Sequence, residues 1–219
     1  MKKKPLLFIS DFDGTATKKD VYLLFLEKYH DETFRRELAE KSARKEFTCF
    51  EYLNTVFNDV NKSGEQIVND LEQIEFDDYL MDFISYTEEI KGDFVIVSAG
   101  GACYIEKILA KNSMSHIPVH ANVSDFVNGG VRMYHDRTSP FHSEKYGIDK
   151  EKVVTYYRDK YELILFAGDS TPDYKAGVAS DYRFAKGLLR TAYDRDGVEY
   201  FPFETFADIM KIVKERILI

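Results

Sequence analysis

Two pairs of aspartates stand at short spacing in the sequence, and each pair directly follows a run of apolar residues. Asp11 and Asp13 frame a glycine-containing turn, and Asp169 and Asp173 follow a second run. Alone, each pair is explained as turn or helix-cap chemistry, because aspartate caps both. Four carboxylates at one place repel one another, and such a cluster usually holds a cation. Magnesium fits best, because it takes hard oxygen ligands and pairs with phosphate, and the acidic loop typical of calcium sites is absent from the sequence.

Three apolar runs position these side chains. Residues 5–10, 93–97 and 163–167 are continuous rather than alternating, which predicts strands buried on both faces of a parallel sheet. Ser98 directly follows the second run. Ligands bind beyond the carboxyl ends of such strands, so the three polar turns are expected to converge there.

The remaining segments complete an α/β prediction. Helical spacing of apolar residues fills residues 18–88, alternation around a turn predicts a hairpin near 117–135, and a helical stripe ends the chain at 206–217. We predict a Rossmann-like parallel sheet flanked by helices, with a helical cap after the first strand and a small β-hairpin insertion. The core is expected at 1–17 and 89–219, and the cap at 18–88.

Composition narrows the classes of protein. The 219 residues carry 30 Lys and Arg against 38 Asp and Glu, a formal net charge of −8, which argues against a general nucleic-acid binder. No apolar run approaches the roughly 18 residues that span a bilayer, so no membrane partner is expected. Cys49 and Cys103 form no CxxC pair, which excludes a disulfide scaffold and a cysteine zinc cluster. Cytoplasm is the expected location, and the oligomeric state stays open.

The order of the motifs along the chain resembles the haloacid dehalogenase (HAD) superfamily of phosphohydrolases. The matching features are the DFDGT turn at 11–15, Ser98, a lysine, and Gly168-Asp169 with Asp173. The helical insertion is similar to the cap of the phosphoserine-phosphatase-like branch, subfamily IB. Within that branch, the residues around Ser98, the predicted hairpin and the segment 168–173 look most like the MtnX-type phosphatases of methionine salvage.

The resemblance implies a role for each matched aspartate. Asp11 would be the nucleophile, giving an aspartyl-phosphate that water hydrolyses. Asp13 would act as general acid and then general base, which requires a raised pKa. Dehalogenase members of the superfamily lack this second aspartate, so Asp13 favours phosphate esters. The implied Mg²⁺ ligands are Asp11, the carbonyl of Asp13, Asp169 and Asp173.

The phosphate-binding groups follow from the same resemblance. Ser98 would donate its hydroxyl to a phosphate oxygen, assisted by the backbone N–H groups of Ala99 and Gly100 at the start of the next helix. Helix capping is a second account of this serine. The family places a lysine at the start of the helix before the third strand, where Lys150 fits best and Lys152 is the second choice.

Two features depart from the relatives. Asp20 is a candidate substrate-binding residue, because it lies where phosphoserine phosphatases carry a glutamate that contacts the substrate amino group. The shorter acid argues against phosphoserine, and N-capping explains Asp20 equally well. The segment 135–142 stands where MtnX-type phosphatases carry a cysteine cluster. It contains His135 and His142, to which, as to His120, we assign no role.

The function expected is Mg²⁺-dependent hydrolysis of the phosphate monoester of a small metabolite, such as phosphoserine or the methionine-salvage enol phosphate. One alternative is a phosphotransferase or mutase of the same superfamily. A second is a non-catalytic protein that binds a phosphorylated metabolite. Asp11→Asn separates these, because it should abolish turnover but leave the ligand affinity of a binding protein largely intact.

Overall fold

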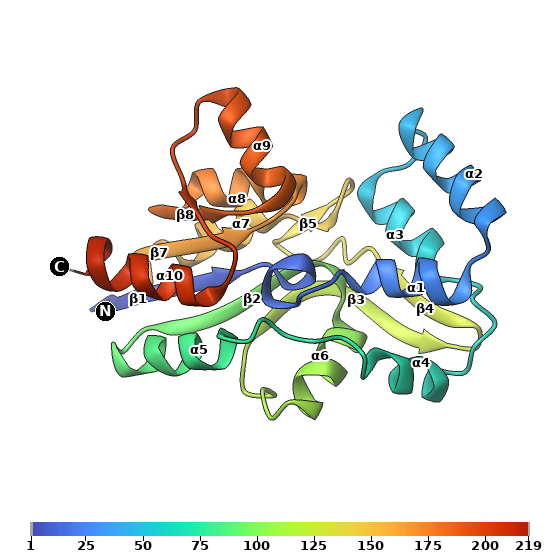
Figure 1. Cartoon of the computed structure of the whole chain (residues 1–219), viewed down its shortest axis with the longest axis horizontal. Helices are drawn as coiled ribbons and strands as arrows, with labels where there is room; N and C mark the ends of the chain where they lie inside the picture. Colours follow the sequence, from blue (N-terminus) through green and yellow to red (C-terminus); the bar gives the residue numbers. More distant parts are fainter. Residues whose placement is uncertain (1, 219) are drawn as a thin grey trace. The chain divides into compact units, whose positions relative to one another are not determined.

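The computed structural model describes residues 2–218, and these form two compact units (Figure 1). The first unit contains the strands that carry the aspartate motifs, and the second contains most of the helices between the first two motifs. The first comprises 2–18, 76–97 and 150–218, and the second comprises 19–75 and 98–149. The predicted core and cap boundaries stay a prediction.

The first unit is built on five parallel strands in the order β2-β1-β7-β8-β9. They are β1 (Lys4–Ser10), β2 (Asp93–Gly101), β7 (Tyr161–Gly168), β8 (Tyr182–Ala185) and β9 (Phe201–Pro202). The last residues of β2, 98–101, belong to the second unit. The three apolar runs are therefore strands of a parallel sheet, as predicted.

Strand β1 is buried on both faces. Leu7, Phe8 and Ile9 have no exposed surface, which explains why apolar residues run continuously here instead of alternating. The aromatic ring of Phe8 lies 4.5 Å from that of Phe83 and 6.0 Å from that of Phe206, measured between centroids. These two rings come from helices α5 (Leu80–Glu89) and α10 (Phe206–Ile212), which therefore pack on the same face of β1.

The helices of the first unit alternate with its later strands, as in other parallel sheets. In Figure 1, α5 lies on one side of the strands β1 and β2, and α8 and α9 lie on the other side, beyond β7. The helices are α5 (Leu80–Glu89), α7 (Lys150–Tyr157), α8 (Tyr174–Ala179), α9 (Gly187–Asp196) and α10 (Phe206–Ile212), which continues as a wider π turn over Val213–Ile217.

The second unit combines five helices with a β-hairpin. Capping boxes begin α3 at Thr48 and α4 at Ser63. The predicted hairpin is β3 (Val119–Val127) and β4 (Gly130–Tyr134), joined through Gly129 at φ 95°; a further short pair, β5 (His142–Ser143) and β6 (Gly147–Ile148), was not predicted. The helices are α1 (Val21–Tyr29), α2 (Glu32–Ala43), α3 (Cys49–Phe57), α4 (Gly64–Leu71) and α6 (Ala102–Lys111). Across residues 2–218, every helix is too short or too polar to cross a membrane.

Candidate active site

The first aspartate motif lies where β1 ends. The Asp11 amide donates to the carbonyl of Ala167 on β7 at 2.9 Å, so the sheet itself places the end of β1 beside the end of β7. The chain then turns through Phe12–Ala16, and the Phe12 amide donates to Asp11 Oδ1 at 2.7 Å. Gly14 has φ 68°, a conformation that costs glycine nothing and most residues 1–2 kcal/mol. The turn thus fixes the Asp11 carboxylate at the sheet edge.

Lys150, the first residue of α7, joins two carboxylates. Its Nζ lies 2.6 Å from Asp11 Oδ1 and 2.6 Å from Asp173 Oδ1, and the lysine side chain is 3% exposed. Burial opposes the charge of this lysine, but the two carboxylates outweigh burial and raise its pKa above the ordinary value. The lysine is therefore a permanent cation of this cluster.

Asp173 is fixed by both of its oxygens. Oδ1 accepts from Lys150, while Oδ2 accepts from the amides of Asp169 and Ser170 at 3.2 and 3.0 Å. The preceding glycine permits this approach, because a Cβ on Gly168 would lie 2.5 Å from Asp173 Cγ. Asp173 thus positions Lys150 and shapes the turn after β7.

The charge balance of the cluster fits a divalent cation. Asp11, Asp169 and Asp173 each offer a carboxylate oxygen, and the three oxygens lie within 4.8 Å of one another. Burial first, and then the charges of Asp173 and Asp169, raise the Asp11 pKa well above 3.8, while Lys150 lowers it. One lysine therefore does not neutralise the three carboxylates, and hard oxygen donors with excess negative charge suit Mg²⁺. Asp13 follows in the turn, with extended backbone at φ −68° and ψ 127°.

The predicted phosphate-binding residues lie in the second unit. The Gly100 amide donates to Ser98 Oγ at 2.9 Å, and the side-chain amide of Asn122 donates to the carbonyl of Ala99 at 2.7 Å. The expectation that these residues start the next helix is wrong, because β2 continues through them and α6 begins two residues after Gly100. Ser98 is therefore not the cap of α6.

The structure also separates the remaining sequence candidates. Of the two lysines considered, Lys150 lies in the carboxylate cluster and Lys152 is exposed on α7. Asp20 occupies the N-cap position of α1, and its carbonyl accepts from the amides of Leu23 and Leu24. Asp20 therefore stands at the N-cap position that the capping explanation gives it, although its side chain makes no capping hydrogen bond to α1.

Lys186 is a cation near the cluster that the sequence analysis missed. It follows β8, is partly buried, and its Nζ lies 3.4 Å from the Thr15 carbonyl in the turn after β1. Burial lowers its pKa, although Asp77 and Asp169 act in the opposite direction. The sequence signal for this residue was a lysine directly after the apolar pair Phe184-Ala185. Because β8 is only four residues long, it shows no clear strand pattern in the sequence.

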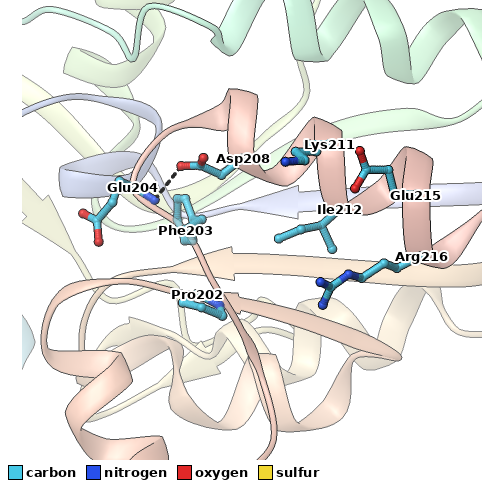
Figure 2. Close-up of a pocket in the computed structure, with 8 residues that line it drawn as sticks. All are labelled: Pro202, Phe203, Glu204, Asp208, Lys211, Ile212, Glu215 and Arg216. Atoms are coloured by element: carbon cyan, nitrogen blue, oxygen red, sulfur yellow. Dashed lines mark hydrogen bonds between the residues drawn. The ribbon is translucent and has the colours of Figure 1, made fainter.

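The hollow drawn in Figure 2 is a different feature of the first unit. It has a volume of about 360 Å³ and contains none of the aspartates or lysines described above. It lies between α10 with its terminal turn and the segment that follows β9, and its lining residues are Pro202, Phe203, Glu204, Asp208, Lys211, Ile212, Glu215 and Arg216. The chemistry of the carboxylates, not the size of a hollow, therefore locates the candidate site.

Comparisons with known proteins cover nearly the whole chain. No family model matches the sequence. The chain is 25% identical over 218 residues, 98% of this chain and 97% of the relative, to a 2-hydroxy-3-keto-5-methylthiopentenyl-1-phosphate phosphatase of Brevibacillus brevis. It is also 25% identical over 207 residues, 93% of this chain and 94% of the relative, to the phosphatase of the same name from Bacillus thuringiensis subsp. konkukian.

Solved structures of phosphoserine phosphatases resemble this chain in fold over nearly its whole length. A phosphoserine phosphatase with an analogue of its phospho-aspartyl intermediate matches with a TM-score of 0.68 at 16% identity, over 97% of this chain and 99% of that one. A substrate-bound phosphoserine phosphatase complex matches with a TM-score of 0.68 at 15% identity, over 98% of both chains. The likeness in fold therefore extends far beyond the carboxylate cluster.

Proposed function

We propose that this chain, which has the phosphoserine-phosphatase-like fold of the HAD superfamily and distant homology to the MtnX-type phosphatases of methionine salvage, is a Mg²⁺-dependent phosphomonoesterase. The observation that carries the proposal is the cluster at the ends of β1 and β7. There a buried Asp11 carboxylate lies 2.6 Å from the Lys150 ammonium, within 4.8 Å of the carboxylates of Asp169 and Asp173.

Asp11 is the proposed nucleophile. One of its oxygens forms a bond to phosphorus as the bond from phosphorus to the ester oxygen breaks, which leaves an aspartyl-phosphate. At 4 Å, each pair of like unit charges costs about 4 kcal/mol at an effective dielectric constant of 20, so the approach needs counter-charge. Lys150 supplies one cation, and Asp173 holds its ammonium beside the nucleophile. When bound by Asp11, Asp169 and the carbonyl of Asp13, Mg²⁺ would neutralise further charge on the phosphate.

Asp13 is the proposed acid and base. It gives its proton to the leaving ester oxygen, then accepts a proton from the water that attacks phosphorus, which frees Asp11 and releases phosphate. Ser98 and the amides of Ala99 and Gly100 are the proposed donors to the phosphate oxygens. These assignments rest on the family resemblance and on the positions of the motifs in the sequence.

The proposed substrate is a small phosphorylated metabolite. Homology over nearly the whole chain to 2-hydroxy-3-keto-5-methylthiopentenyl-1-phosphate phosphatases favours that enol phosphate. The structural likeness to a substrate-bound phosphoserine phosphatase complex supports a phosphate ester of similar size. Asp20 in place of a glutamate argues against phosphoserine itself.

The test is release of inorganic phosphate from a panel that includes both compounds, with Mg²⁺ and with EDTA. We expect release from the wild-type protein that EDTA abolishes and that Asp11→Asn reduces below detection. The matched control is Asp159→Asn, which removes the charge of an exposed aspartate after α7 and should leave release unchanged. If the phosphoryl group were transferred to an added alcohol and no free phosphate were released, the chain would be a phosphotransferase and not a hydrolase. Binding of these compounds without any turnover would refute catalysis.

A further inference from the structure

A second cluster of metal-ligating side chains lies in the second unit. His135 directly follows β4, His142 begins β5, and Glu144 lies in the turn between β5 and β6. Each residue offers one ligand atom, and the three atoms lie within 4.8 Å of one another. We propose that His135, His142 and Glu144 bind a transition-metal dication of the Zn²⁺ type, with water completing the coordination.

The carboxylate of this cluster is already oriented. Arg137 donates two hydrogen bonds to Glu144, from Nε to Oε1 at 2.9 Å and from Nη2 to Oε2 at 3.2 Å. The ring Nε2 of His142 lies 3.1 Å from the same Oε1. Carboxylates that bind metals commonly accept hydrogen bonds of this kind from a neighbouring side chain, which orients them toward the ion. Arg137 therefore orients the third ligand.

His135 supplies the observation that points most directly to a ligand. Its imidazole stacks on Phe50 of α3 with ring centroids 3.8 Å apart, and its Nδ1 is buried without a hydrogen-bond partner among residues 2–218. A buried polar nitrogen that lacks a hydrogen-bond partner is unfavourable, and such groups are rare in folded proteins. The rings of His135 and His142 have centroids 5.2 Å apart at an interplanar angle of 81°. A metal between them would satisfy the orphaned nitrogen.

The turn that carries Glu144 is held by contacts outside the cluster. Asn122 on β3 donates to the carbonyl of Tyr146 at 3.0 Å, and Ser143 pairs with Gly147 across β5 and β6. Gly147 has φ 75°, and a Cβ there would lie 2.0 Å from Asn122 Oδ1. Contacts other than those of the three proposed ligands therefore help to hold the turn that carries Glu144.

The ligand chemistry selects a metal other than Mg²⁺. Two imidazoles and a carboxylate suit Zn²⁺ and related transition metals, with ligand bonds of about 2.0–2.2 Å, whereas Mg²⁺ prefers oxygen donors alone. Three protein ligands with a water in the fourth position is a common zinc arrangement. The all-carboxylate cluster of Asp11 and this cluster should therefore take different ions, and the inference does not depend on the proposed phosphatase activity.

The test is the zinc stoichiometry of the purified full-length chain, measured by competition with a chromophoric chelator at pH 7.5 in excess Mg²⁺. We expect one tight equivalent in the wild-type protein and none in His135→Gln or His142→Gln. His116→Gln, at an exposed position, is the matched control, and Asp169→Asn tests the other cluster. Both should retain the full equivalent.

Two further measurements separate binding from folding. Co²⁺ should give intense visible d–d bands with the wild-type chain and lose them in His142→Gln, while circular dichroism without metal stays unchanged. Zinc should also raise the melting temperature of the wild-type chain but not that of His142→Gln. No zinc equivalent in the wild-type chain, or an equivalent that survives His135→Gln and His142→Gln, overturns the proposal.

Discussion

Replacing Lys150 by methionine tests the electrostatic account of the candidate site. The substitution keeps an unbranched side chain of similar length but removes a buried charge that lies 2.6 Å from both Asp11 and Asp173. At an effective dielectric constant of 20, each of these contacts corresponds to about 6 kcal/mol of Coulomb attraction, much of it offset by the cost of burial. Removing one partner of a buried pair typically costs about 3–5 kcal/mol, because the other charge is left uncompensated.

Protonation sets a ceiling on this cost. In the variant, one carboxyl can take up a proton instead of staying buried as an anion. Protonating a carboxyl with an ordinary pKa of 3.8 costs about 4 kcal/mol at pH 7 and about 1.6 kcal/mol at pH 5. The native carboxyl then has a pKa above its unfolded value, so the native state binds more protons than the unfolded state. Stability of Lys150→Met should therefore fall by up to about 2–3 kcal/mol as pH rises from 5 to 7. The fall should be steeper than that of the wild-type chain, in which Lys150 lowers the pKa of Asp11.

The assay is urea unfolding of Lys150→Met and wild type at pH 5 and pH 7, in EDTA so that no metal replaces the lost charge. Lys152→Met is the control, because a substitution at an exposed position on the same helix should change stability by less than about 0.5 kcal/mol. A loss for Lys150→Met below about 1 kcal/mol at pH 7, or a loss that does not shrink at pH 5, would refute the reasoning.

Three further predictions concern single side chains. Gly168→Ala should destabilise the chain by about 1–3 kcal/mol in urea unfolding, because the new methyl group would lie 2.5 Å from Asp173 Cγ; a neutral result would show that the turn after β7 yields easily. Asn122→Ala should cost about 1–3 kcal/mol by the same measurement, because its buried side-chain amide donates to two backbone carbonyls; a loss under about 0.5 kcal/mol would contradict this. Burial raises the pKa of the Cys103 thiol to about 11, from an ordinary 9.0. In the Cys49→Ser background, iodoacetamide should therefore alkylate Cys103 about 10-fold more slowly at pH 8 than a thiol of pKa 9, because the smaller thiolate fraction outweighs the higher nucleophilicity of that thiolate. The rate should still rise tenfold per unit of pH up to pH 10, and a plateau near pH 9 would argue against the shift.

The sheet was predictable because burial on both faces leaves a direct trace in the sequence. The runs that became β1, β2 and β7 are continuous and apolar, and each stops at a polar turn. The hairpin over 119–134 and the final helix were equally visible from their periodicity. The HAD resemblance drawn from the motif order agrees with the comparisons.

Short elements and long-range contacts were not predictable. Strands β8 and β9 have four and two residues, too few to show a period, so the lysine that β8 places near the site was missed. Strand character also continues from Val97 through Gly101, where the family resemblance implied the start of a helix instead. The ion pair of Lys150 with Asp11 joins residues far apart in the sequence, and no local pattern distinguishes that lysine from the exposed Lys152.

The central place of β1 between β2 and β7 has a consequence for biosynthesis. The partners of Asp11 on α7 and after β7 are made about 140–160 residues after Asp11 itself. At roughly 5–20 residues per second, the edge of β1 that pairs with β7 therefore stays open for about 7–30 s. Non-local strand pairing of this kind slows folding, and a hydrophobic strand with an open edge is a template for aggregation. We therefore expect that nascent chains arrested before Lys150 depend on chaperones, and that yield in expression responds to conditions that shorten this interval.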